Sequence, residues 1–277
     1  MSEYPDFDQH WQAVSHHYLH LFRCHDLGNG HKEVLITRHD RWHREPDHIP
    51  TPKTDDERRA ANAERAARRA KSEVRRRCKA MGLDSLLTLT YRANQQDEEL
   101  CKLHLKEFVR RLRRLVPGFA YVAAFERQKR GAWHVHLAVH RIQSHFMQSG
   151  VRVKSFDLVR SVWRSVVGDL GGNIDIQRKR RSSAKTGAQL AAYLSKYMTK
   201  GHEEGREYQK RYTCSRYQMP EPIRRCFYNE NIRQLIQYVV DTYASGPCQI
   251  RCCLVDGGKG FFMTVEPLSD RSKSRSL

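Results

Sequence analysis

Two histidines alternate with apolar residues in the segment Trp133-His-Val-His-Leu137, and the composition of residues 132–140 predicts a β-strand. Residues two positions apart in a strand share a face, so His134, His136 and His140 point one way while the apolar residues between them point the other. A strand with a complete apolar face does not need imidazoles on its reverse face in order to fold. We therefore interpret these histidines as functional, and metal binding is the chemistry that imidazole nitrogens support most directly.

A carboxylate is predicted to stand opposite the histidines. The preceding strand, residues 119–126, ends in Glu126, and a three-residue loop over 129–131 with glycine in its last position predicts a hairpin that pairs Glu126 with His134. Directly opposed side chains have Cβ atoms about 4.5–5.5 Å apart, and His136 is the diagonal neighbour, so two imidazole nitrogens and a carboxylate oxygen can converge on one cation. An open site with these ligands suits a catalytic divalent ion that also binds a substrate oxygen, and Mg, Mn and Zn all fit it chemically.

Two tyrosines and two lysines share one face of a predicted helix over residues 189–200. Tyr193 and Tyr197 are four residues apart, and Lys196 and Lys200 continue the same stripe. Tyrosines at this spacing are usually packing residues, but the interleaved lysines argue against a buried role. A phenol with a pKa of about 10 is a poor nucleophile at neutral pH, whereas a lysine that stabilises negative charge and a metal that polarises a phosphate would make its attack feasible. This face therefore indicates transesterification on a phosphodiester.

These residues need a sheet and helices to position them. From residue 83 to residue 202 the hydrophobic patterns follow the order strand, helix, strand, strand, helix, strand, helix. The predicted ranges are 85–91, 97–115, 119–126, 132–140, 155–168, 173–177 and 189–200. Short links between consecutive strands favour antiparallel pairing, so we expect an α+β fold with a central antiparallel β-sheet and helices packed on one face, an RRM-like or ferredoxin-like layout.

The flanking segments are expected to be simpler. Residues 1–52 hold nine of the 15 histidines without sustained periodicity and are predicted to be an irregular extension. Residues 53–82 are predicted to form a basic, mostly solvated helix with Thr54 as its N-cap, either a surface helix with internal Glu-to-Arg pairs or a phosphate-contacting arm. Residues 203–277 are predicted to be a C-terminal extension with one helix at 231–243 and a strand near 260–265.

The charge balance points to a polyanionic partner, first of all nucleic acid. The 277 residues include 50 Lys and Arg against 31 Asp and Glu, a formal net charge of +19. No apolar stretch approaches the roughly 20 residues of a membrane span, and the first residues do not resemble a secretion signal, so we expect a cytoplasmic location. Two basic segments either track a DNA backbone or are ordinary surface charge: residues 206–216 and the run that contains Arg178, Arg180, Arg181 and Lys185.

Three motifs, in this order, resemble those of the HUH endonuclease superfamily, specifically the rolling-circle replication initiator (Rep) proteins of phages and plasmids with two active-site tyrosines. Leu86-Leu-Thr-Leu-Thr90 resembles the first motif, Trp133-His-Val-His-Leu137 the metal-binding His-hydrophobic-His motif, and Tyr193-Leu-Ser-Lys-Tyr197 the two-tyrosine motif. The resemblance covers residues 83–200, a little under half of the chain. Because the tyrosines follow the histidine motif, the order resembles that of replication initiators rather than conjugative relaxases.

The resemblance implies a site-specific single-strand DNA endonuclease, or nickase, that is also a strand transferase and initiates rolling-circle replication. It implies a divalent ion, Mg or Mn, that polarises the scissile phosphate and is held by His134, His136 and Glu126. His140, further along the same strand face, is the alternative third ligand.

The tyrosine motif carries the expected covalent step. The resemblance implies that Tyr193 or Tyr197 attacks the phosphate, which gives a covalent 5′-phosphotyrosine and a free 3′-hydroxyl, and that Lys196 and Lys200 position the phosphate. The sequence contains no Gly-x-x-x-x-Gly-Lys-Ser/Thr phosphate-binding loop. We therefore expect a host helicase and DNA polymerase as partners, in the cytoplasm of a bacterial host. The resemblance implies origin DNA, single-stranded or supercoiled, as the substrate.

Two alternatives stay open at this point. One is a transposase of the same superfamily with the same metal and tyrosine chemistry, although paired tyrosines are unlike its common single-tyrosine type. The other is a non-catalytic module that binds single-stranded nucleic acid on an RRM-like sheet. Such a module would have no use for Glu126, His134 and His136 facing one another. The sequence makes no prediction about oligomeric state.

Overall fold

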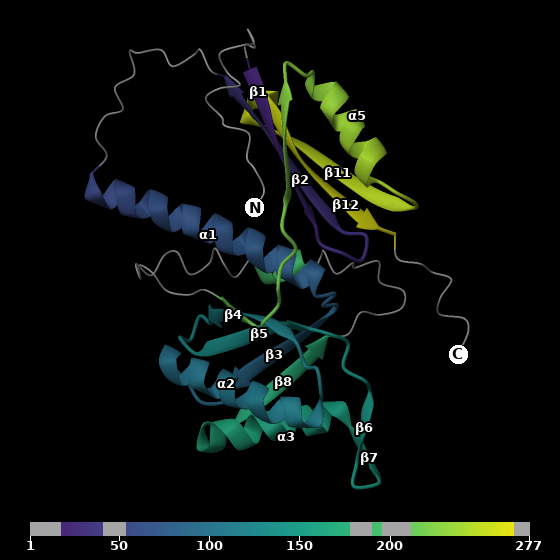
Figure 1. Cartoon of the computed structure of the whole chain (residues 1–277). Helices are drawn as coiled ribbons and strands as arrows, with labels where there is room; N and C mark the ends of the chain where they lie inside the picture. The colour runs from purple at the N-terminus through teal and green to yellow at the C-terminus, as the bar shows by residue number, and fades with distance from the viewer. Residues whose placement is uncertain (1–17, 41–53, 178–189, 196–211, 269–277) are drawn as a thin grey trace. The chain divides into compact units, whose positions relative to one another are not determined.

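The computed structural model describes residues 18–40, 54–177, 190–195 and 212–268, which belong to two compact units (Figure 1). One unit takes in residues 52–219, and the other combines residues 1–51 with residues 220–277. Each unit contains its own five-stranded sheet. Within the described ranges, no helix is both long enough and apolar enough to cross a bilayer.

The unit of residues 52–219 is built on a sheet with the strand order β8-β3-β5-β4-β9, in which every neighbouring pair is antiparallel. Its strands are β3 (Ser85–Tyr91), β4 (Tyr121–Arg127), β5 (Trp133–Val139), β8 (Gly172–Gln177) and β9 (Tyr212–Cys214). Its helices are α1 (Asp55–Ala80), α2 (Glu98–Leu115), α3 (Ser155–Val167), the short η1 (Gly168–Leu170) and the helical residues 190–195. The expected α+β succession is confirmed from β3 to β8, and a hairpin of β6 (His145–Gln148) and β7 (Val151–Lys154) is an addition to it.

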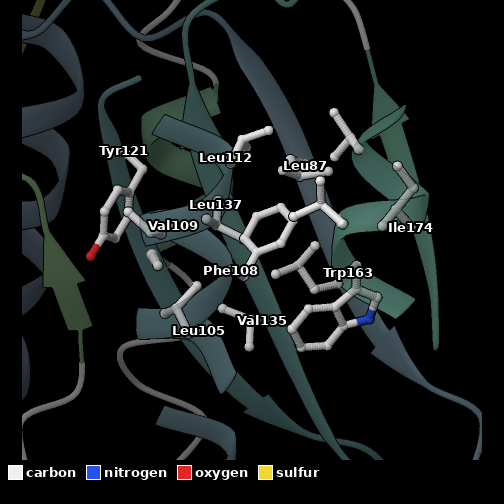
Figure 2. Packing of buried hydrophobic residues seen from close by; sticks show 14 of the residues in the cluster. Leu87, Leu105, Phe108, Val109, Leu112, Tyr121, Val135, Leu137, Trp163 and Ile174 are labelled. Carbon is white, nitrogen blue, oxygen red and sulfur yellow. The ribbon is translucent and has the colours of Figure 1, made fainter. Parts of the chain in front are cut away.

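Helices α2 and α3 cover one face of this sheet, as the patterns predicted. Helix α2 begins after Asp97, whose carboxylate accepts a hydrogen bond from the backbone N–H of Leu100 at 3.1 Å. Figure 2 shows Phe108 of α2 packed among apolar side chains of the strands, with Trp163 of α3 beside it. Both rings are fully buried, and the Trp163 indole N–H donates to the backbone oxygen of Thr90 at 2.9 Å. This core holds β3, β4 and β5 in place, so that their alternate residues form the opposite face.

Part of the opposite face is also covered. The last turns of α1 place Val74, Cys78 and Met81 at helical spacing against a cluster of strand residues, namely Leu86, Val122, Ala124 and Ala138. Residues 190–195 add Ala191 and Leu194 to the same cluster. The first turn of α1 is exposed, as expected for a solvated basic helix, but its C-terminal end is a packing element of the sheet.

The second unit has the strand order β10-β1-β2-β12-β11, again antiparallel throughout. Its strands are β1 (Tyr18–Asp26), β2 (Lys32–Asp40), β10 (Ile223–Tyr228), β11 (Cys248–Val255) and β12 (Gly260–Pro267), and the short η3 (Asp256–Gly258) joins the last two. Helix α5 (Ile232–Tyr243) packs Leu235 and Val239 against Phe22, Ile36 and Phe261 of the strands.

This second unit differs from the expected pair of extensions. Residues 18–40 are a β-hairpin rather than an irregular segment, because Phe22 and Cys24 of β1 alternate with polar residues and point at α5. Strand β1 pairs with β10, so Leu19 lies opposite Tyr228, and strand β2 pairs with β12. The predicted helix and the last predicted strand of the C-terminal segment correspond to α5 and β12.

Candidate functional site

The hairpin of β4 and β5 sets the positions of the candidate metal ligands. Glu126 lies directly opposite His134, and Ala124 lies opposite His136, which is the predicted register. In the loop, the backbone N–H of Gly131 donates to the oxygen of Gln128 at 2.8 Å. Gly131 has φ +90°, in the left-handed region that favours glycine, so the three-residue loop fixes the register as expected.

His136 is held between two side chains on neighbouring strands. Its Nε2 lies 2.9 Å from Oε2 of Glu126, and its Nδ1 lies 3.2 Å from Oγ1 of Thr88. An ionised carboxylate only accepts hydrogen bonds, so Nε2 donates to Glu126 and, in the neutral imidazole, Nδ1 accepts from the Thr88 hydroxyl. The ring is buried at 6% exposure, and these two contacts fix its orientation.

His134 lies next to His136 on the same face of β5. The two ring centroids are 6.2 Å apart, with the rings tilted by 62°. Burial lowers the pKa of His134 to about 4. The charge that His136 carries when it is protonated acts in the same direction, and the Glu126 carboxylate acts in the opposite direction. His134 is therefore neutral at neutral pH and has a nitrogen lone pair available to a cation.

Of the two residues considered as the third metal ligand, Glu126 and His140, the structure places only Glu126 in contact with His136. Glu126 contacts His136, whereas His140 is exposed beyond the end of β5 and is separated from His136 along this face by the buried Ala138. The structure therefore favours Glu126 over His140 as the partner of the pair. In the described part of the chain, no group of three or more His, Cys, Asp or Glu side chains has the arrangement of a metal site. Instead, Glu126 and His136 are hydrogen-bonded to each other, and His134 lies beside His136.

Tyr193 belongs to a helix that packs on the same sheet face as the histidines. Ala191 and Leu194 of residues 190–195 are completely buried against the cluster that contains Ala138, while the Tyr193 side chain is 40% exposed. Ala138 is two residues from His136 on β5, so the two share a face. The remaining predicted residues lie outside the described ranges: Tyr197, Lys196, Lys200, Arg178, Arg180, Arg181 and Lys185.

Two polar residues of this face were not singled out from the sequence. Thr88 of β3 lies opposite His136, and Asp175 of β8 lies opposite Thr88 on the other side, so the three form a row across the sheet. The Asp175 side chain is exposed, and its Oδ2 accepts a hydrogen bond from Gln177 at 3.0 Å. The alternation in Leu86-Leu-Thr-Leu-Thr90 is the signal that places Thr88 and Thr90 on a common face.

A family model described as replication-associated protein, of the ORF2 type, matches residues 84–202. The matched segment covers a little under half of the chain and contains Thr88, the β4–β5 hairpin and Tyr193. The match suggests a replication initiator family, and a role in DNA replication fits it. No curated protein and no solved structure matches the chain.

Proposed function

We propose that this protein is a metal-dependent single-strand DNA nickase and strand transferase that initiates rolling-circle replication, with the chemistry of the HUH endonuclease superfamily. One observation carries the proposal. His136 is held by Glu126 and Thr88, with His134 beside it, on the sheet face against which the Tyr193 helix packs. Metal-assisted transesterification needs a cation and a nucleophile at the same phosphate, and this sheet face offers residues for both.

The donor atoms of Glu126, His134 and His136 suit a divalent ion such as Mg or Mn, with Zn also compatible. When bound, such an ion would supply positive charge that polarises the scissile phosphate. The Thr88 hydroxyl is suited to orient His136 as a metal ligand. A metal-binding histidine donates its other ring N–H to a nearby acceptor, and a hydroxyl can both donate and accept. Thr88 can therefore accept from Nδ1 of His136 when Nε2 is a ligand, and donate to it when Nε2 faces Glu126.

The covalent step falls to the tyrosines. The phenol oxygen of Tyr193 or Tyr197 gives up its proton and attacks phosphorus, so that a P–O bond to tyrosine forms and the bond to the 3′ oxygen breaks. The 3′ oxygen takes up one proton in exchange for the one the phenol loses. The products are a 5′-phosphotyrosine and a 3′-hydroxyl, so no water is consumed and the phosphodiester energy is kept for rejoining. Lys196, with Lys200, stabilises the charge on the phosphate. The second tyrosine can accept the strand at the end of a replication round.

The other parts of the proposal concern the DNA and its handling. Arg178, Arg180, Arg181 and Lys185 bind the backbone of the origin strand through charge. The sequence holds no Walker-type phosphate-binding loop, and strand separation and synthesis are assigned to a host helicase and polymerase.

Covalent adduct formation tests the proposal. Purified full-length chain is incubated with a pool of labelled single-stranded DNA and Mn²⁺, and the products are separated on a denaturing gel. We expect a metal-dependent, SDS-resistant adduct that is lost in the Tyr193→Phe/Tyr197→Phe double variant, and the single variants rank the two tyrosines.

Tyr228→Phe is the matched control, because Tyr228 is 39% exposed, close to the 40% of Tyr193, and belongs to the other unit. This variant should form the adduct at the wild-type rate. If an origin-containing strand is bound but no adduct forms under any metal condition, nicking is refuted and the protein is a nucleic-acid-binding module.

A further inference from the structure

Helix α1 packs against the sheet of its own unit, that of residues 52–219, near its C-terminal end, and on the same helix face Ala67 is buried at its middle. Its 26 residues span about 39 Å at 1.5 Å per residue. Near its C-terminus, Val74 and Cys78 are completely buried against the sheet cluster, whereas the first turn, Asp55–Arg58, is exposed. Figure 1 shows the N-terminal end of α1 projecting beyond the sheet of its own unit.

The projecting part is a defined helix rather than a frayed end. Thr54 and Glu57 form a capping box, in which the Thr54 hydroxyl accepts from the Glu57 N–H at 3.2 Å and the Glu57 carboxylate accepts from the Thr54 N–H at 2.9 Å. Side chains on this helix therefore keep fixed positions relative to the packed end.

Three arginines form a stripe along α1. Arg58, Arg65 and Arg69 are separated by seven and four residues, so they lie on one helix face, and all three are exposed. At 100° per residue this face is opposite the one that carries Val74 and Cys78. The stripe extends over about 16 Å of helix and is directed away from the packed surface.

The partners of these arginines leave their charges largely available. The Arg58 guanidinium is 2.6 Å from Asp55, but both side chains are well exposed, so the pair is weak. Arg65 donates to the amide oxygen of Asn62 at 2.6 Å, and Asn62 carries no charge. Arg69 makes no hydrogen bond or ion pair with any residue that the structure describes. Arg65 and Arg69 are also a like-charge pair four residues apart, which destabilises a helix unless an anion lies between them.

Position distinguishes this stripe from other surface charge. Helix α2 also carries an exposed row, Lys106, Arg110 and Arg114, of which Arg110 is paired with Glu107, but α2 packs on the sheet face opposite the histidines. Helix α1 packs on the same face as His136 and Glu126, through Ala124 and Ala138. The stripe on α1 therefore lies on the histidine side of the sheet, and the row on α2 lies on the other side.

We propose that Arg58, Arg65 and Arg69 of α1 bind the phosphate backbone of the DNA substrate without reading its bases. The proposal rests on the proposed function in that DNA is taken as the substrate. The stripe contributes affinity and salt dependence, because each phosphate contact releases bound counterions from the DNA.

Salt-dependent binding of a labelled oligonucleotide to the full chain, followed by fluorescence anisotropy, tests this proposal. Loss of three phosphate contacts should reduce the slope of log Kd against log salt by about 2 for single-stranded DNA and about 2.7 for duplex DNA. We expect this reduction in the Arg58→Ala/Arg65→Ala/Arg69→Ala variant. The triple lysine variant at the same positions should keep the wild-type slope, because it keeps the charge. Alanine favours helix, so the triple alanine variant should retain the wild-type circular dichroism spectrum.

The matched control is Lys106→Ala/Arg110→Ala/Arg114→Ala on α2, which removes the same three charges. An unchanged slope in the α1 variant, or an equal reduction in both alanine variants, would overturn the proposal. Failure of the proposed function is a separate outcome, since it appears as an absent covalent adduct while the wild-type chain still binds DNA with its full salt slope.

Discussion

The contact between Thr88 and His136 gives the sharpest test of the proposed site. Replacing Thr88 with valine keeps the shape of the side chain and removes the hydroxyl that lies 3.2 Å from Nδ1 of His136. Both residues are buried, so Nδ1 loses its partner where water has little access, at a cost of about 1–3 kcal/mol of folding stability. Because such second partners orient metal-binding histidines, we expect the metal affinity to fall by about 10- to 100-fold.

The assay is the Mn²⁺ concentration that gives half-maximal covalent adduct. A 10- to 100-fold increase corresponds to about 1.4–2.8 kcal/mol of binding free energy. At saturating Mn²⁺ the Thr88→Val variant should recover most of the wild-type rate, because Thr88 positions His136 and does not touch the phosphate. Thr88→Ser restores a hydroxyl and should restore the wild-type metal requirement.

Thr90→Val is the control, since Thr90 lies on the same face of β3, opposite His134, but its hydroxyl donates to the backbone oxygen of Asn173 at 3.1 Å. This variant should leave the half-saturating Mn²⁺ concentration unchanged. If Thr88→Val and Thr90→Val require the same Mn²⁺ concentration as the wild type, the hydroxyl does not orient His136 for metal binding and the reasoning is wrong.

Three further predictions concern the site, the core and the thiols. Glu126→Gln keeps the size of the side chain but removes its charge, so Mn²⁺-dependent adduct should fall by at least tenfold while oligonucleotide anisotropy shows unchanged DNA binding. Phe108→Ala should lower the free energy of unfolding in urea by about 3–5 kcal/mol because its ring is completely buried, whereas Leu103→Ala on the exposed side of α2 should change it by less than about 0.5 kcal/mol. Burial raises the pKa of Cys24 to about 11 from 9.0. Maleimide at pH 8 should therefore label the exposed Cys253 readily and Cys24 only after unfolding, as mass spectrometry of the labelled peptides will show. Because the thiol is held protonated in the folded state, its contribution to stability is complete below pH 9 and is lost as the pH rises to 11.

Local sequence signals predicted the part of the site that local geometry determines. The pairing of Glu126 with His134 follows from one loop length and one glycine, because a hairpin loop fixes the register of the strands beside it. The contact of Thr88 with His136 joins residues 48 positions apart and depends on which strands become neighbours. Strand alternation gave the face of Thr88 but could not give its partner.

In the second unit, contacts between segments far apart in the sequence determine even more of the structure, and the sequence patterns predicted less of it. Residues 18–40 contain a turn signal, Gly28-Asn29-Gly30, between two strands. Their alternation is interrupted by His20 and Arg38, which lie on the same face as Phe22 and Ile36, and by Leu21 and Leu35 on the other face. The strands are completed by β10 and β12, which come about 200 residues later in the chain. A segment whose apolar face is covered only by such distant elements looks irregular when its own residues are considered alone.

The face of β5 that carries the histidines has two parts, one that packs against helices and one that holds polar side chains. Ala138 and, on β4, Ala124 are small enough for α1 and residues 190–195 to pack against the strands. Two residues before Ala138, His136 is buried on the same face but contacts the polar side chains of Glu126 and Thr88. The change from alanine to histidine along one strand therefore marks the boundary between a packed surface and a polar one. Because Tyr193 and the arginine stripe of α1 belong to the two elements that form the cover, the packing that stabilises this face also sets the positions of the proposed nucleophile and of the arginines proposed to bind DNA.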